Sequence, residues 1–369
     1  IRVDLDALTH NLRALRAHAG VPVMGIVKAN AYGHGLVPVA LHLQAQGVEQ
    51  LGVAFLEEGI LLRQAGVHVP ILVMGGIFGP QAAGFIAHDL EITVSSLDKL
   101  RQIEAAAQAL GRKAIIHLKI DTGMERIGVH SYNAGPFIEA AIASSWCEVK
   151  GVYSHLACAD DPASPMTVRQ LERFLDACAH FERIGAPMPL RHLANSGGVL
   201  HFPDTHLDMV RPGIALYGVL PDPASRCTVD IRPAISLVSQ VVYFKVVEAG
   251  HPVSYGATWA PERDTRVVTI PIGYGDGFPR SLSSRGEVLI RGQRYPIVGR
   301  VCMDQFMVDI GPQGTAYNED EVVLIGRQGD AEIRCEAVAH SAGTIPYEIL
   351  VGLNERIPRE YLGVALSRI

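Results

Sequence analysis

Residues 22–29, PVMGIVKA, form a short apolar run that ends in a lysine, and seven further runs of this kind follow before residue 217. Longer segments separate the runs, and in two of them, 97–110 and 168–184, apolar residues recur every three or four positions. Buried strands that alternate with amphipathic helices indicate repeated βα units. Eight units predict an α/β fold, a closed (β/α)8 TIM-like barrel. The other seven runs are LGVAF (51–55), ILVMG (71–75), EITVS (91–95), AIIHLKI (114–120), VKGVYSHLA (149–157), LRHLA (190–194) and LDMV (207–210).

The pattern changes after about residue 232. Most later runs are β-rich and are separated by Gly, Pro or charged turns, as in SLVSQVVYFKVV (236–247) and EVVLIG (321–326). We therefore predict two domains, the barrel over 1–231 and a mainly β domain over 232–369. The first few residues are candidates for pairing with the second domain. Two short helices are expected in the second domain, at about 336–342 and 347–353.

The composition favours a small-molecule partner. The chain has 369 residues, of which 48% are hydrophobic and 19% charged, so it can bury a large core. The net charge is −6, and neither sign gathers into a long run, which argues against a nucleic-acid surface. The longest uncharged stretch, 64–88, is interrupted by Gly and Pro and predicts a core strand with loops rather than a membrane span.

The cysteines and the N-terminal residues bear on the compartment. No CxxC pair or regular cysteine spacing is present, so we expect neither a metal site nor a disulfide framework, and a reducing cytoplasm fits best. The segment IRVDLDALTHNLRALR (1–16) carries acidic residues and an amphipathic pattern, unlike a signal peptide. Removal of a leader upstream of residue 1 stays open. The six cysteines are Cys147, Cys158, Cys178, Cys227, Cys302 and Cys335.

Lys28 is the first candidate for chemistry. It ends a predicted buried strand, and in a barrel of this kind the active site lies at the C-terminal ends of the strands. Partial burial would lower the pKa of its ammonium group, and the neutral amine could then form a Schiff base. Position alone favours equally a lysine that extends along the barrel rim to reach solvent.

The longer segment around Lys28 resembles a known family. VKANAYGHG (27–35) is similar to the pyridoxal-phosphate attachment motif of alanine racemases. Similar segments follow in that family's order over nearly the whole chain, which makes chance agreement implausible. They are HLKIDTGMERIG (117–128), GVYSHLACAD (151–160), RHLANSGG (191–198), RPGIALYG (211–218), VSYGATW (253–259), GYGDGF (273–278), VGRVCMDQFMVD (298–309) and TIPYEI (344–349).

The resemblance implies an isomerase that interconverts L- and D-alanine. Lys28 would hold pyridoxal 5'-phosphate as an aldimine and also act as one of two bases, with Tyr255 on the opposite face. Racemisation removes a proton from one face of Cα and returns it to the other, which suits two such groups. His155 would lie beside Tyr255 and be linked to Arg211, which would face the pyridine nitrogen. A guanidinium can only donate, so that nitrogen would stay unprotonated.

The resemblance also implies a set of groups around the cofactor and its phosphate. As isolated features these groups are weak signals, because an NSGG turn is usually a helix cap. The cofactor-binding residues would be Lys28, Tyr32, His155, Asn195, Ser196, Arg211, Gly213, Ile214 and Tyr347, with the amides of Gly213 and Ile214 facing the phosphate.

For the substrate, the resemblance implies Arg126 as the carboxylate partner, helped by the Met303 N–H and by Tyr255. Lys119 matches a family position that can be carbamylated, which would turn a cation into an anion able to orient Arg126. Glu125 stands where many relatives have glycine and adds a negative charge beside Arg126. For Asp121 we expect an ordinary role, as a cap at the end of its strand.

Tyr255 and Met303 fall in the second domain and Lys28 in the first. The resemblance implies that they meet across a homodimer interface, where a narrow pocket favours a methyl side chain. A racemase of broader specificity, acting on serine or other small amino acids, is the alternative. The Tyr255 segment argues against a decarboxylase. The second domain argues against a barrel protein that carries the cofactor without turnover, since such proteins resemble the barrel alone. D-alanine synthesis for a cell wall and L-alanine recovery use the same chemistry, so both roles stay open.

Overall fold

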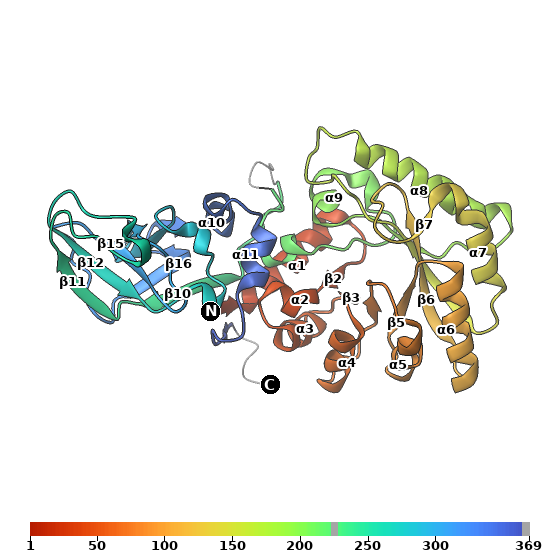
Figure 1. The fold of residues 1–369 in the computed structure, drawn as a ribbon. Coiled ribbons are helices and arrows are strands. Elements are labelled where there is room, and N and C mark those ends of the chain that lie inside the picture. Colours follow the sequence, from red (N-terminus) through yellow and green to blue (C-terminus); the bar gives the residue numbers. More distant parts are fainter. Residues whose placement is uncertain (223–227, 364–369) are drawn as a thin grey trace.

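The computed structural model describes residues 1–222 and 228–363 of the chain, so Cys227 lies outside the described residues. The chain folds into two lobes (Figure 1). The larger lobe contains a parallel sheet surrounded by helices, and the smaller one contains a mostly antiparallel sheet. Most buried apolar side chains of both lobes belong to one continuous core.

The parallel sheet follows the chain order of the predicted runs. Its strands pair as β2-β3-β4-β5-β6-β8-β9, and the two-residue strand β7 (Val129–His130) pairs with the end of β6. Most residues of β2 to β6 are buried, as expected for strands covered on both faces, whereas β8 and β9 are partly exposed. The strands are β2 (Met24–Ile26), β3 (Gln50–Val53), β4 (Ile71–Val73), β5 (Glu91–Val94), β6 (Ala114–Asp121), β8 (Cys147–Tyr153) and β9 (Leu190–His192).

The eighth predicted run, 207–210, closes the barrel without forming a full strand. Val210 bridges Val23 on one side, and Met209 bridges His192 on the other. The Met24 N–H donates to the Val210 carbonyl at 2.8 Å, and the Val210 N–H donates to the Pro22 carbonyl at 3.0 Å. The predicted barrel is thus confirmed, with its eighth strand reduced to two bridges.

The helices of the larger lobe lie outside its strands, with α3 to α6 along its lower edge in Figure 1. The predicted helices 97–110 and 168–184 are confirmed as α6 and α8, and α6 begins at the Ser96 cap and ends at Gly111. The helices are α1 (Leu5–Ala19), α2 (Lys28–Tyr32), α3 (Leu36–Ala45), α4 (Leu56–Gln64), α5 (Ala82–Ala87), α6 (Leu97–Leu110), α7 (Ala134–Ala143), α8 (Met166–Arg183) and α9 (Ser196–His201). Three-residue or four-residue 3-10 turns include η4 (Ile214–Tyr217) and η5 (Tyr255–Ala257).

The second sheet has the order β11-β12-β15-β14-β13-β16-β10-β1-β18, with β17 paired to β16. Residues from both ends of the described chain join it, because β1 pairs with β10 and with β18. The strands are β1 (Arg2–Asp4), β10 (Ile235–Gln240), β11 (Tyr243–Val247), β12 (Thr265–Ile270), β13 (Glu287–Ile290), β14 (Gln293–Val298), β15 (Phe306–Asp309), β16 (Glu321–Gln328), β17 (Ala331–Ile333) and β18 (Glu360–Leu362).

Two helices connect the second sheet to the barrel. They are α10 (Cys335–Ala342) and α11 (Pro346–Gly352), close to the predicted positions. Helix α11 packs beside α2, so residues of α11 reach the mouth of the barrel. Within residues 1–222 and 228–363, no helix combines the length and apolar character that a membrane span requires.

Candidate active site

A cavity of about 210 Å³ lies at the C-terminal ends of the barrel strands. Each strand end places a different side chain there, since β2 is followed by Lys28, β8 by His155, and the 207–210 segment by Arg211. This is the position at which (β/α)8 barrels build their active sites. The lining residues are Ile26, Lys28, Ala29, Tyr32, Met74, His155, Asn195, Ser196, Arg211, Gly213, Tyr347 and Val351.

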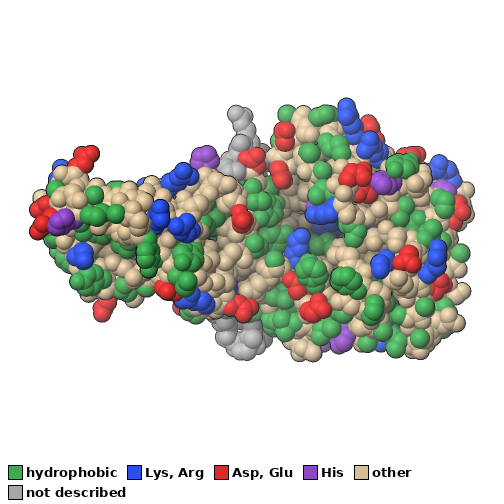
Figure 2. All heavy atoms as spheres, in the orientation of Figure 1, with side chains coloured by type: hydrophobic (Ala, Val, Ile, Leu, Met, Phe, Trp, Pro, Cys, Tyr) green, Lys and Arg blue, Asp and Glu red, His purple; other side chains and the backbone are tan. Residues whose placement is uncertain are grey.

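Eight residues that the sequence predicted as site residues therefore meet in one cavity. Figure 2 shows Lys and Arg side chains in a hollow of the larger lobe, near its junction with the smaller one. Four lining residues were not predicted: Ile26, Ala29, Met74 and Val351. Ile26, Met74 and Val351 are apolar residues near a strand end or within a helix, and sequence alone does not distinguish such residues from core residues. The position of Ala29, next to Lys28, was the one signal that could have identified it.

The backbone after Lys28 has an unusual conformation. Four consecutive residues, Ala29 to Tyr32, have φ between 52° and 55°, which is the left-handed helical region. This region costs residues other than glycine roughly 1–2 kcal/mol each. The Glu58 carboxylate accepts from the Ala29 N–H at 2.7 Å, and the Asn30 side chain accepts from the Leu36 N–H at 2.8 Å. Strain of this kind, held by surrounding contacts, is typical of functional sites.

Lys28 lies in an environment that disfavours its charged form. Burial lowers the pKa of its ammonium group, and the positive charge of Arg126 lowers it further, against the opposing charge of Glu58. A lower pKa increases the fraction of neutral amine, which is the nucleophilic form. The predicted direction of this shift is confirmed.

One end of the cavity is lined by hydroxyl groups. The Ser196 Oγ accepts from the Gly213 N–H at 2.9 Å and from the Ala215 N–H at 3.2 Å, at the start of η4. The Tyr32 and Tyr347 rings lie 6.1 Å apart, and burial raises the pKa of both phenols, so both hydroxyls stay protonated. A Cβ on Gly213 would lie 2.4 Å from the Tyr32 Oη, so this space requires glycine.

Gly213 and Asn195, at this end of the cavity, already take part in hydrogen bonds within the chain. The Gly213 N–H, which we predicted to face a phosphate, donates to Ser196 in the structure, so its phosphate contact stays a prediction. Asn195 caps α9 by accepting from the Gly198 N–H at 3.0 Å, the structural role that the NSGG turn left open. Ile214 is buried as the first residue of η4 and is not among the residues that line the cavity.

Arg211 is buried and held in one orientation. Its Nη2 donates to the carbonyl oxygens of Ser154 at 2.8 Å and Leu193 at 3.1 Å, and it lies 3.4 Å from the His155 Nδ1. Its Nη1 lies 3.1 Å from the His192 Nδ1. Burial lowers the pKa of the guanidinium to about 10, so it still carries its charge at neutral pH. The predicted link between His155 and Arg211 is present.

The segment after β6 carries the residues predicted for the substrate carboxylate. The Asp121 carboxylate accepts from four successive backbone N–H groups, and this confirms the expected cap. Glu125 has φ 54°, which explains a preference for glycine here, and its carboxylate pairs with His130 at 2.9 Å. Arg126 is exposed at the end of this turn. The donors of the four hydrogen bonds are Gly123, Met124, Glu125 and Arg126.

Lys119 is buried inside the barrel, with its Nζ 4.2 Å from the centre of the Tyr153 ring. Burial lowers the pKa of Lys119 well below its usual value, and the charges of Arg211 and Arg126 act in the same direction. Within the described residues no carboxylate forms an ion pair with Lys119 at contact distance. Burial and the cationic neighbours therefore both disfavour the charged form of this amine.

Tyr255 and Met303 are not brought to this cavity within one chain. Tyr255 is 72% exposed and Met303 is 53% exposed, on the second lobe. Ser254, just before Tyr255, has φ 71°, and its hydroxyl donates to the Arg300 carbonyl at 2.7 Å. The phenol thus stands on a constrained turn and faces outward.

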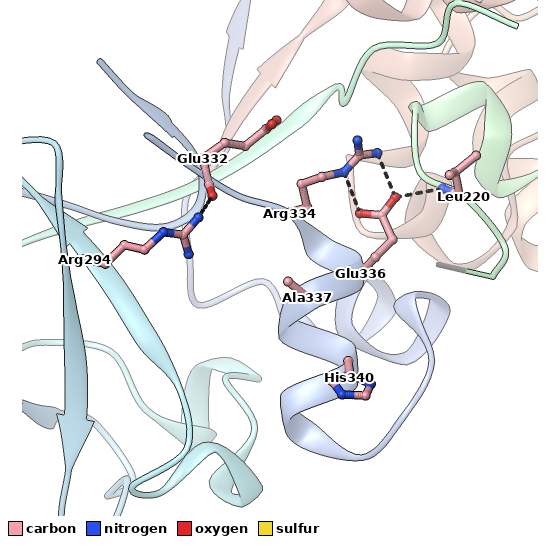
Figure 3. Close-up of a pocket in the computed structure, with 7 residues that line it drawn as sticks. All are labelled: Leu220, Arg294, Glu332, Arg334, Glu336, Ala337 and His340. Atoms are coloured by element: carbon pink, nitrogen blue, oxygen red, sulfur yellow. Dashed lines mark hydrogen bonds and ion pairs between the residues drawn. The ribbon is translucent and has the colours of Figure 1, made fainter. Parts of the chain in front are cut away.

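A larger cavity, of about 520 Å³, lies between α10 and the second sheet (Figure 3). It shares no lining residue with the Lys28 cavity. Its charged groups already contact each other, since Arg334 pairs with Glu336, and Glu336 accepts from the Leu220 N–H at 3.0 Å. Size alone therefore does not identify the active site of this molecule.

Two family models match most of the chain, one over each lobe. The alanine racemase N-terminal domain family matches residues 3–221, and the C-terminal domain family matches 234–361. An alanine racemase of Symbiobacterium thermophilum is 44% identical over 98% of this chain and 96% of its own.

Solved structures agree with this match. A crystal structure of alanine racemase from the D-cycloserine producer Streptomyces lavendulae has a TM-score of 0.93, with 41% identity over 98% of this chain and 96% of its own. A Bartonella henselae alanine racemase with covalently bound pyridoxal phosphate has a TM-score of 0.89, with 31% identity over 98% of each chain. The predicted family is confirmed: the chain belongs to the alanine racemase family.

Proposed function

We propose that this chain is an isomerase that interconverts L- and D-alanine with pyridoxal 5'-phosphate bound at Lys28. The observation that carries the proposal is the cavity that joins Lys28, with a lowered pKa, to Ser196, Tyr32 and Arg211. The Bartonella relative, described with covalently bound pyridoxal phosphate, supports the choice of cofactor.

The residues of the cavity fit this cofactor. Lys28 would hold the aldehyde carbon, Arg211 would face the ring nitrogen, and the hydroxyls of Ser196, Tyr32 and Tyr347 would surround the phosphate. Gly213 lets the Tyr32 hydroxyl approach the start of η4, since a Cβ on residue 213 would lie 2.4 Å from the Tyr32 Oη. His155, Asn195 and the Ile214 N–H complete the proposed set. When bound, the cofactor accepts the electron pair that is left when the Cα proton is removed.

Lys28 and Tyr255 would exchange the proton at Cα from opposite faces. Lys28 can take a proton because burial and Arg126 favour its neutral form. His155, held near Arg211, would lie beside the phenol and support its loss and gain of a proton. Since Tyr255 stands exposed on the other lobe, we propose that it enters the cavity of a second subunit in a homodimer, together with Met303.

Arg126 would bind the substrate carboxylate, with the Met303 N–H as a second donor. We propose further that the buried amine of Lys119 is carbamylated. The lowered pKa favours the neutral amine, whose lone pair can attack carbon dioxide while its nitrogen releases one proton to solvent. The resulting carbamate anion would lie near Arg211 and Arg126, the cations that disfavour the ammonium form of Lys119. The product would orient the Arg126 guanidinium toward the substrate.

The free cysteines support a reducing compartment, and we place the protein in the cytoplasm. The described cysteines, which exclude Cys227, form no disulfide. Both a D-alanine supply for the cell wall and a recovery of L-alanine are consistent with this location.

The test compares the wild type with Lys28→Ala and Tyr255→Phe, starting from each alanine enantiomer. The wild type should form the opposite enantiomer from both, followed by polarimetry, and show cofactor absorbance that changes on adding alanine. Each variant should lose racemisation by about 100-fold or more, since a positioned base contributes that much. Tyr243→Phe, an exposed tyrosine on the same lobe, is the matched control and should stay active.

Retention of racemisation by both Lys28→Ala and Tyr255→Phe would contradict the two-base scheme. Serine in place of alanine tests the alternative of broader specificity. A methyl-sized pocket predicts a much lower kcat/KM for serine, whereas similar values would favour the broader racemase.

A further inference from the structure

A chain of hydrogen bonds crosses the barrel interior and ends at Arg211. The Glu91 Oε2 lies 2.8 Å from the His117 Nε2, the His117 Nδ1 lies 2.9 Å from the His192 Nε2, and the His192 Nδ1 lies 3.1 Å from the Arg211 Nη1. Glu91 begins β5, His117 lies within β6, and His192 ends β9. This series of hydrogen bonds therefore runs from the N-terminal ends of the barrel strands to their C-terminal ends, where the cavity lies.

The chemistry of the two ends fixes the direction of every bond. A guanidinium can only donate, so the His192 Nδ1 must be the unprotonated nitrogen and its Nε2 must carry the proton. That proton is donated to the His117 Nδ1, so the proton of His117 is on its Nε2 and points to Glu91. An ionised carboxylate accepts it. A different tautomer of either ring, or an imidazolium, would place two donors face to face.

The carboxylate is held in its accepting form. Burial alone would raise the pKa of Glu91, but the hydrogen bond from the neutral His117 and the hydrogen bond and charge of Lys150 act against burial and keep the pKa below its usual value. Lys150 pairs with the Glu91 Oε1, and Gln50 donates to the Oε2 that also faces His117. Both histidines are completely buried, and Glu91 is only 3% exposed.

The residues packed around His117 and His192 restrict the orientations of both rings. A Cβ on Gly151, the β8 neighbour of His117, would lie 2.2 Å from the His117 Nδ1. The His192 ring stacks on Tyr153 with centroids 4.7 Å apart and planes 7° apart. The rings therefore cannot turn over freely, and the position of each proton depends on the partner at its end.

We propose that Glu91 is a positioning residue for the active site at the opposite end of the barrel. By accepting from His117 it sets the tautomers of both histidines, so that His192 offers a lone pair to Arg211. That lone pair, with the Ser154 and Leu193 carbonyls, holds the guanidinium plane that faces the cavity. The inference rests on the proposed function, in which Arg211 donates to the cofactor ring nitrogen.

The first measurement needs no substitution in the chain. The holoenzyme is labelled with 15N in histidine, and its tautomers are read from long-range 1H–15N correlations, with His117→Gln and His192→Gln used only to assign signals. For both histidines the wild type should show a protonated Nε2 and an unprotonated Nδ1. A protonated Nδ1 on His192 overturns the proposal, whatever the enzymatic activity.

The second measurement compares Glu91→Met with Lys150→Met. Removing one partner of a buried ion pair strongly destabilises a fold, a cost that is reduced here because Lys150, with 37% of its side chain exposed, can reach solvent. Glu91→Met should disturb the His192 tautomer, shift the absorbance of the bound cofactor, and lower kcat about tenfold, as loss of an orienting partner does elsewhere. Lys150→Met keeps the Glu91 carboxylate and its hydrogen bonds from His117 and Gln50, so its tautomers and kcat should stay close to those of the wild type.

The outcomes separate this proposal from the proposed function. Normal tautomers in Glu91→Met, or altered tautomers with unchanged absorbance and kcat, would show that Glu91 serves only stability. A wild type that binds the cofactor but does not racemise alanine would refute the proposed function, while the tautomers of its histidines could still be measured in the same sample.

Discussion

Asp121 illustrates how one side chain organises the substrate side of the site. Its two oxygens accept from the N–H groups of residues 123–126, which fixes the turn that carries Arg126. Burial would raise the pKa of Asp121, but these four hydrogen bonds outweigh that effect and lower it. A carboxylate that is stabilised in this way contributes to folding in its ionised form.

The lowered pKa of Asp121 determines how its contribution to the free energy of unfolding changes with pH. The contribution of Asp121 is complete above the pKa of an unfolded aspartate, about 3.9, and is lost as the pH falls through the lower folded value. We expect Asp121→Asn to lower the free energy of unfolding by about 2 kcal/mol at pH 7, because the amide NH2 would face the Arg126 N–H. Urea denaturation at pH 7 and near pH 3 checks this, and a difference that does not shrink in acid would contradict it.

Individual site residues differ in how visible they are in the sequence. Lys28, Ser196 and Arg211 could be predicted because they are polar residues at predicted strand ends within specific motifs. Ile26 and Met74 could not, since an apolar residue beside a cavity has the same sequence signal as one in the core. The tautomers of His117 and His192 depend on partners up to 75 residues apart in sequence, which no local pattern encodes.

At the scale of elements, the most unusual feature is the left-handed turn α2. No glycine occurs in its residues 28–32, so its conformation could not be predicted from local propensity. The helices α6 and α8 were predictable because their ends and apolar spacing agree with each other. The run 236–247 was not predicted to divide, but Val241 and Val242 bond to different partners, Asp320 and Thr269, as the chain passes from β10 to β11.

The strain of α2 predicts an unusual effect of a glycine substitution. Ala29 is exposed and has φ 53°, so Ala29→Gly should raise the free energy of unfolding by roughly 0.5 to 1 kcal/mol, after the greater flexibility of the unfolded chain is subtracted. Ala105→Gly in the ordinary helix α6 is the matched control and should lower it by about 1 kcal/mol. Chemical denaturation measures both, and effects of the same sign would refute the assigned strain.

At the scale of the whole molecule, the proposed site residues are divided between the two lobes. The cavity with Lys28 lies in the barrel, whereas Tyr255, Met303 and Tyr274 are exposed on the other lobe, at 72%, 53% and 42%. Exposed aromatic and apolar residues that gather on one lobe are typical of an interaction surface. We therefore expect the sites to be shared between two subunits, which a symmetric dimer would supply twice.

Mixing two inactive variants tests this sharing. If Lys28 and Tyr255 of one site come from different chains, a hybrid of Lys28→Ala and Tyr255→Phe subunits contains one intact site and one doubly altered site. Random mixing after dissociation should then restore about a quarter of the wild-type activity, because half of the dimers are hybrids with one working site each. If both residues came from the same chain, no site in any hybrid would be intact.

The control for this experiment mixes two variants that alter the same half of the site. Hybrids of Lys28→Ala with Arg211→Glu should stay inactive if sites are shared, because Lys28 and Arg211 line one cavity of one chain and each altered subunit keeps a damaged cavity. Alanine racemisation is followed by polarimetry, and subunit exchange by mass spectrometry. Full exchange with no recovered activity in the Lys28→Ala and Tyr255→Phe mixture would exclude the shared site, whereas recovery there and none in the control requires a phenol that reaches across the interface.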